Sequence, residues 1–218
     1  MFQELLDRPG AHSYGGNGIS PSTTVQDPEE EEGAGPEAEV LQALSRGDRK
    51  QALKLLMGLY GTAIYNYCRH MLGDAALADD VHQTTFEQVF FDLPRYRGQS
   101  SLRIWVYSIA RHRCMDMLKM NRRREQHIET REALPEVVSE ELTAEERAVI
   151  ASHGKHLARC LELLPEKARD AILQRFMGQM SYEEMAKLSG ERAATLQMRV
   201  TRALPDLRRC LEQAGVAR

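Results

Sequence analysis

Hydrophobic residues recur at steps of three and four along most of the chain, which is the pattern of helices with one buried face. From about Glu37 to Met71 this pattern predicts a helical hairpin that turns near Gly47. A second helix is expected to end at Pro94, because the residue before a proline is disfavoured in the helical region. A third helix follows, with an expected apolar face of Leu102, Trp105, Val106, Ile109, Ala110 and Met117.

The second half of the chain predicts shorter helices. Thr143 and Ser181 each begin a capping box, in which the hydroxyl and a glutamate three residues later bind each other's free backbone donors. After Ser181, a short helix, a turn at Gly190 and a further helix form the pattern of a helix-turn-helix. Pro205 is expected to bend or end that last helix. The expected fold is therefore all-α, with two small helical domains joined by a flexible linker.

Charge is distributed unevenly, although the formal net charge is only −3. The first 40 residues carry a net charge of −8, which leaves +5 on the remainder. Residues 1–37 are rich in Gly, Ser, Pro and Glu, so they are expected to form a disordered acidic extension. Two interpretations stay open for it, a competitor of nucleic acid for a basic surface or an inert leader. Residues 125–143 are acidic again and predict a linker, which is either a nucleic-acid mimic or a plain spacer.

The strongest positive charge lies in residues 95–124, which carry a net charge of +8. Arg103, Arg111, Lys119 and Arg122 fall on the side of the predicted helix opposite its apolar face. Such a helix can pack into a domain and still present cations to phosphates. A solvated surface helix would show the same pattern, so the charges alone leave both interpretations open.

The beginning of this basic segment has a distinctive sequence. Residues 96–111 read Tyr-Arg-Gly-Gln-Ser-Ser-Leu-Arg-Ile-Trp-Val-Tyr-Ser-Ile-Ala-Arg. This run is similar to the promoter-melting segment of the extracytoplasmic-function sigma factors, small two-domain bacterial transcription initiation factors of the sigma-70 family. The resemblance implies sigma region 2 over residues 38–124 and sigma region 4, a helix-turn-helix domain, over residues 144–218. It also implies that the basic helix opens the minus-ten promoter element and holds a flipped-out base. The residues expected to bind there are Arg97, Arg103, Arg111, His112, Lys119, Arg122 and Arg123.

A polar stripe precedes the basic segment. Asp80, Gln83 and Glu87 share one face of a predicted helix, a pattern that most often marks a solvated surface. Residues 80–86 read Asp-Val-His-Gln-Thr-Thr-Phe and resemble the family motif that docks on the coiled coil of the RNA polymerase β′ subunit. The resemblance therefore implies that this stripe binds polymerase. His82 replaces an apolar residue of the family motif.

The last predicted helix is expected to lie in the major groove of the minus-thirty-five element, as in similar sigma factors. Its outward residues are expected to be Arg192, Thr195, Gln197, Met198, Arg199, Thr201 and Arg202. Gln197 and Met198 replace the Lys-Ser of relatives, which removes a phosphate-binding charge. Glutamine can pair with adenine and methionine can contact a thymine methyl group.

Two other classes of function fit the sequence less well. A stand-alone helix-turn-helix regulator would need a dimerising or ligand-binding domain, and none is recognisable. An enzyme would need a P-loop, a nucleophile beside a base, or a set of metal ligands, and the sequence shows none of these. His156 and Cys160 are spaced to share a metal on a helix, but no second cluster completes the ligands. No catalytic residue, cofactor, metal or small-molecule substrate is therefore expected.

The cysteines and the apolar runs indicate the cellular compartment of the protein. The four cysteines, Cys68, Cys114, Cys160 and Cys210, include no Cys-x-x-Cys pair, and we predict four reduced thiols in a cytoplasmic bacterial protein that joins the nucleoid when active. No apolar run approaches the roughly 20 residues needed to cross a bilayer, so no membrane insertion is expected. The expected partners are core RNA polymerase, promoter DNA and, from the resemblance alone, an anti-sigma factor.

Overall fold

The computed structural model describes residues 35, 37–125 and 154–216 of the 218-residue chain. Across these residues the chain is helical and contains no strand, which confirms the predicted all-α fold. The expected linker and the capping box at Thr143 lie outside the described residues, and so does the acidic extension except for its last part. No helix within the described ranges combines the length and apolar character that crossing a bilayer requires.

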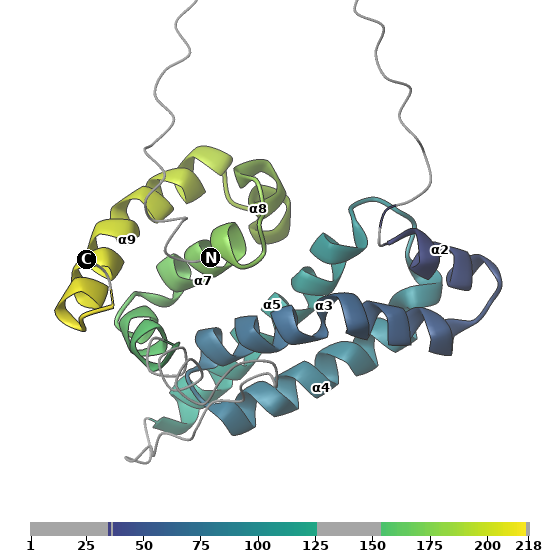
Figure 1. Cartoon of the computed structure of the whole chain (residues 1–218), viewed down its shortest axis with the longest axis horizontal. Helices are drawn as coiled ribbons and strands as arrows, with labels where there is room; N and C mark the ends of the chain where they lie inside the picture. Colours follow the sequence, from purple (N-terminus) through teal and green to yellow (C-terminus); the bar gives the residue numbers. More distant parts are fainter. Residues whose placement is uncertain (1–34, 36, 126–153, 217–218) are drawn as a thin grey trace, which may run out of the picture.

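The first region is a bundle of four helices (Figure 1). They are α2 (Ala38–Ser45), α3 (Arg49–Leu72), α4 (Ala75–Asp92) and α5 (Leu102–Glu125), with a short 3₁₀ turn, η1 (Leu93–Arg95), after α4. Asp48 and Asp74 begin α3 and α4, because each carboxylate accepts a backbone N–H three residues later. Gly73 ends α3 with φ of 73°, a left-handed conformation that glycine adopts without strain. The predicted hairpin and the following helix are confirmed.

The second region contains a helical stretch at residues 154–162 and the helices α7 (Glu166–Phe176), α8 (Tyr182–Ser189) and α9 (Ala193–Gln213). Ser181 and Glu184 form the predicted capping box at the beginning of α8. Gly190, with φ of 71°, ends α8 and allows the tight turn into α9. The helix-turn-helix is therefore confirmed, and its core is formed by Leu161, Ile172, Met185, Leu196, Val200 and Leu207.

Pro205 does not end the last helix. The helix α9 continues past it to Gln213. Leu207 and Leu211, both beyond the proline, are buried, so packing on the second region keeps this part of the chain helical. Tertiary packing thus outweighs the lost backbone donor of one proline.

The prediction of four reduced thiols is wrong for two of them. Cys160 and Cys210 form a disulfide, with their Cα atoms 5.7 Å apart. The helical stretch at residues 154–162 packs against the end of α9, which brings together two cysteines that are 50 residues apart in sequence. Cys68 and Cys114 are free, as predicted, and both are buried.

The helix α5 is buried on more of its circumference than its sequence pattern predicts. Leu102, Val106 and Ala110 are buried as expected, whereas Trp105 is only partly buried and packs on the ring of Tyr96. Four residues that were not assigned to the apolar face are also buried, namely Ile104, Tyr107, Cys114 and Leu118. The reason is that α5 contacts α3 and α4 in its own region and α8 in the other.

Glu37 fixes the beginning of α5. Its carboxylate accepts the backbone N–H groups of Leu102 at 3.1 Å and Arg103 at 2.9 Å, and the hydroxyl of Tyr60 at 2.6 Å. A carboxylate at a helix N-terminus satisfies free donors and interacts favourably with the helix dipole. Burial and the neighbouring Glu37 also raise the pKa of Tyr60.

Substituting Glu37 by alanine is expected to lower the free energy of unfolding by about 1–2 kcal/mol, because two helix donors and the Tyr60 hydroxyl lose their acceptor. Chemical denaturation followed by circular dichroism measures this. Glu39→Ala is the control, since Glu39 is exposed on α2. Equal unfolding midpoints for the two variants would contradict the capping role.

The two regions pack against each other. The helices α7 and α8 lie beside α3 and α5 (Figure 1). The buried apolar residues of both regions form one continuous core. The hydroxyl of Tyr107 on α5 donates to the carbonyl of Met177 at 3.3 Å. This junction determines the surroundings of the basic helix.

Candidate nucleic-acid and protein interfaces

The polar stripe on α4 is exposed. Asp80, Gln83 and Glu87 all lie at the surface, and the Gln83 amide donates to a Glu87 carboxylate oxygen at 2.9 Å. His82 instead faces α3, where a ring nitrogen lies 3.1 Å from the Gly61 carbonyl oxygen, and burial lowers the pKa of this histidine. The structure thus brings the three predicted residues together on one accessible face and separates His82 from them.

Three of the predicted minus-ten residues contact the second region. The Nε atom of Arg111 lies 2.8 Å from Oδ2 of Asp170 on α7. Arg103 donates to the Gly178 carbonyl and also approaches Glu184. Arg122 pairs with Glu166 at the beginning of α7. These arginines are therefore on one side of α5, as predicted, but carboxylates of the same chain already neutralise them.

The other four predicted minus-ten residues are exposed. They are Arg97 in the loop before α5, and His112, Lys119 and Arg123 on α5. His112 and Lys119 both approach the carboxylate of Asp116, at 3.2 Å and 3.5 Å. The structure therefore divides the predicted minus-ten set into a covered group and an open group.

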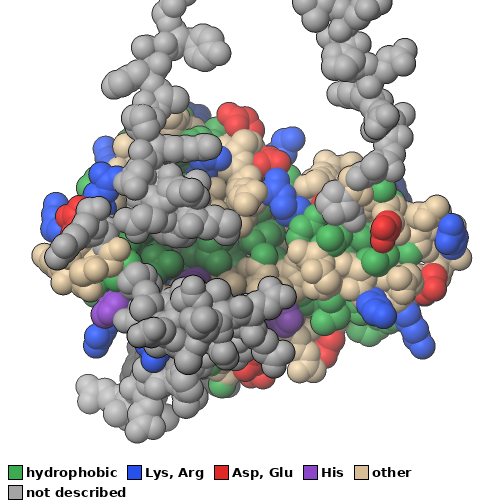
Figure 2. All heavy atoms as spheres, viewed as in Figure 1, with side chains coloured by type: hydrophobic (Ala, Val, Ile, Leu, Met, Phe, Trp, Pro, Cys, Tyr) green, Lys and Arg blue, Asp and Glu red, His purple; other side chains and the backbone are tan. Residues whose placement is uncertain are grey.

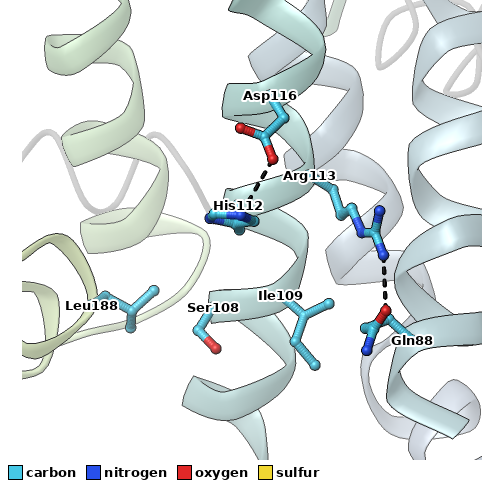
Figure 3. Close-up of a pocket in the computed structure, with 7 residues that line it drawn as sticks. All are labelled: Gln88, Ser108, Ile109, His112, Arg113, Asp116 and Leu188. Atoms are coloured by element: carbon cyan, nitrogen blue, oxygen red, sulfur yellow. Dashed lines mark hydrogen bonds and ion pairs between the residues drawn. The ribbon is translucent and has the colours of Figure 1, made fainter. Parts of the chain in front are cut away.

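A cavity of about 550 Å³ lies beside His112, between the two regions (Figure 3). Its walls come from α4, α5 and α8, and Leu188 is the contribution of the second region. Arg113 donates to the side-chain oxygen of Gln88 at 2.9 Å and links α5 to α4.

The outer face of α9 matches its prediction except at one position. The exposed residues are Arg192, Thr195, Gln197, Met198, Thr201 and Arg202. Arg199 is half-buried and makes two hydrogen bonds to the carboxylate of Glu191, at 3.0 Å and 2.5 Å. This contact lowers the pKa of Glu191, which therefore remains charged and holds the arginine against the turn.

Two charged residues of α7 were missed by the sequence reasoning. Asp170 is only 4% exposed and accepts hydrogen bonds from Tyr67 at 2.8 Å, from Arg111 and from Gln174 at 2.6 Å. Arg169, 8% exposed, donates to backbone carbonyls of both regions. Little in the sequence indicated their role, because α7 contains other charged residues and its pattern does not identify the partners.

Basic side chains are not gathered into one patch on the face shown in Figure 2, where they alternate with acidic ones. Among the described residues, no group of His, Cys, Asp and Glu is arranged to hold a metal ion.

Comparisons with known proteins agree with this architecture. The family model for sigma-70 region 2 matches residues 56–124, and the model for sigma-70 region 4 matches residues 155–207. The extracytoplasmic-function RNA polymerase sigma factor SigD of Mycobacterium tuberculosis is 30% identical over 202 residues, covering 90% of this chain and 91% of SigD. The sigma factor SigZ of Bacillus subtilis is 27% identical over 147 residues, covering 67% of this chain and 79% of SigZ.

Two solved structures share the fold. The sigma factor RpoE of Bartonella quintana, in complex with the anti-sigma factor NepR, has a TM-score of 0.59 at 21% identity and covers 73% of this chain and 96% of its own. CnrH, in complex with the cytosolic domain of CnrY, has a TM-score of 0.57 at 20% identity, with 80% and 95% covered. The two matched regions and the relative at 30% identity lead to one conclusion: the chain belongs to the extracytoplasmic-function sigma factors of the sigma-70 family.

Proposed function

We propose that this sigma factor binds core RNA polymerase through the exposed face of α4 formed by Asp80, Gln83 and Glu87. The observation that carries this proposal is the exposed polar stripe, which lies within the matched region 2. The two carboxylates can accept charge-assisted hydrogen bonds from a basic partner, and the Gln83 amide can donate.

The same region binds and melts the minus-ten element. Cations on α5 follow the strand backbone, while unstacked bases need a pocket next to them. The proposed contacts are Arg97, Arg103, Arg111, His112, Lys119, Arg122 and Arg123. His112 beside the junction cavity is the candidate for contact with the flipped-out base.

The helix α9 enters the major groove of the minus-thirty-five element as a recognition helix. Gln197 and Met198 are exposed at adjacent positions near its N-terminal end, which is the part of such a helix that contacts base edges. They favour adenine and thymine contacts respectively. Phosphate and base contacts are also proposed for the exposed residues beside them, Arg192, Thr195, Thr201 and Arg202. Arg199 is proposed to contact DNA as well, either while it is paired with Glu191 or after that pair has opened.

The protein acts without catalysis of its own and works in the bacterial cytoplasm, where its polymerase is. The two solved relatives are bound to NepR, an anti-sigma factor, and to CnrY. A corresponding anti-sigma protein is proposed as a regulator of this chain.

Gel filtration with core polymerase, followed by run-off transcription from genomic promoter fragments, tests the proposal. The chain is expected to elute with the core enzyme and to start transcripts that core enzyme alone does not produce. A chain that binds duplex DNA tightly but never elutes with polymerase would instead be a stand-alone helix-turn-helix regulator.

Removing Arg202 should weaken duplex binding and flatten its salt dependence. Arg202 is exposed on α9, and each lost phosphate contact reduces the slope of log affinity against log salt concentration by about 1. Fluorescence anisotropy of a labelled duplex at several salt concentrations measures the slope for Arg202→Ala. Arg209→Ala is the control, since Arg209 is exposed at the far end of the same helix. An unchanged slope for Arg202→Ala would remove this residue from the interface.

A further inference from the structure

The basic face of α5 is covered by acidic groups from three separate positions of the second region. Asp170 and Glu166 belong to α7 and Glu184 to α8, and they contact Arg111, Arg122 and Arg103 respectively. Arg103 also donates to the Gly178 carbonyl in the loop after α7. The cover therefore follows α5 from its first turn, at Arg103, to its last, at Arg122.

The central contact is built into both regions. Asp170 is almost fully buried, and it binds Arg111 at 2.8 Å while Tyr67 of α3 donates to its other oxygen at 2.8 Å. Because this carboxylate accepts hydrogen bonds from two residues of the first region, it fixes the position of α7 on that region. Two less buried ion pairs surround this contact, with Arg122 61% and Arg103 28% exposed.

The covered groups are those that a nucleic acid would bind. A carboxylate and a phosphate oxygen accept the same hydrogen bonds from a guanidinium group, so each arginine can bind only one of them at a time through those donors.

We propose that the second region is a reversible cover of the basic helix, in which Glu166, Asp170 and Glu184 occupy the arginines in place of the phosphates of single-stranded DNA. The inference rests on the proposed function, because it needs these arginines to bind promoter DNA. In this arrangement only the open fraction of the molecules binds, so the apparent affinity for a single strand is reduced by that fraction.

The Arg122–Glu166 pair is the most exposed contact of the cover, so salt and competing phosphates reach it most easily. The cavity next to His112 shows that α8 does not fill the junction on that side, where Leu188 faces the open space (Figure 3). A strand with many phosphates can therefore displace the acidic side chains one after another.

The test compares two double variants of the full chain with the same change of charge. Glu166→Gln with Glu184→Gln weakens the cover and leaves every proposed DNA contact in place. Glu183→Gln with Glu212→Gln removes two exposed carboxylates that face neither Arg103 nor Arg122. Binding of a fluorescent single-stranded oligonucleotide is measured by anisotropy at low salt, and the radius of gyration by small-angle X-ray scattering.

The cover variant is expected to bind the oligonucleotide about 3–10-fold more tightly than the control variant, with a larger radius of gyration. Equal affinity and equal radius in the two variants would overturn the proposal. A third variant separates this failure from failure of the proposed function. Lys119→Ala with Arg123→Ala, added to the cover variant, should reduce oligonucleotide binding, because both residues are exposed on α5 and belong to the proposed DNA-binding set. Unchanged binding there, together with an enlarged radius, would reject the DNA-binding face while keeping the cover.

Discussion

Replacing Arg169 by methionine is expected to lower the free energy of unfolding by about 3–5 kcal/mol, because several backbone carbonyls lose a charged donor. The guanidinium group donates to the carbonyls of Leu161 at 2.9 Å, Glu162 at 2.8 Å and Met71 at 2.9 Å. These carbonyls lie at or beside the ends of two helices, the stretch at residues 154–162 and α3, where carbonyl groups have no partner within the helix. One side chain thus binds carbonyl groups near the ends of two helices that belong to different regions.

Guanidinium chloride unfolding at equilibrium measures this loss. Methionine keeps much of the length and apolar surface of the arginine stem, so the change reports mainly the lost hydrogen bonds. Arg159→Met is the control, because Arg159 is exposed on the helical stretch at residues 154–162. A loss below about 1 kcal/mol for Arg169→Met would show that water replaces the guanidinium group at these carbonyls.

Changing Asp80 and Gln83 together to alanine is expected to weaken binding to core polymerase by about tenfold, which corresponds to about 1.4 kcal/mol. Both side chains are exposed, so their removal takes away groups that a partner can bind without opening the core. The loss of Gln83 also frees the Glu87 carboxylate from its hydrogen bond, which makes the remaining acidic group less well oriented.

Titration of labelled protein with core polymerase measures the dissociation constant of this variant. A matched control exists on α2, where Glu39→Ala with Gln42→Ala removes an acid and an amide that are also three residues apart and exposed. The unfolding midpoint of both variants should equal that of the parent. Unchanged polymerase affinity for the α4 variant would reject the docking assignment, since the fold would be intact.

Local features of this protein could be predicted from the sequence. Helix beginnings such as Ser181 and the turn at Gly190 depend on residues within one turn of each other, and the structure confirms them. The exposure of Asp80, Gln83 and Glu87 follows from the period of the helix, which their spacing already contains. For the same reason the outer face of α9 was predicted correctly at most positions.

Features that depend on distant residues could not be predicted. The contacts of Glu37 with Leu102 and of Asp170 with Tyr67 join positions 65 and 103 residues apart, and the periodicity of a single helix carries no information about them. The same holds for the Cys160–Cys210 bond and for Pro205, where packing of the end of α9 decides the outcome. The sequence correctly identified the cations on α5. It did not predict that carboxylates of α7 and α8 would pair with three of them, because those contacts depend on how the two regions pack.

The bond between Cys160 and Cys210 has a topological consequence for the second region. It closes a ring that contains α7, α8 and most of α9. A protease that cuts the chain once inside this ring would leave both pieces attached to each other. The helix α9 would then remain tethered to the rest of the protein after such a cut.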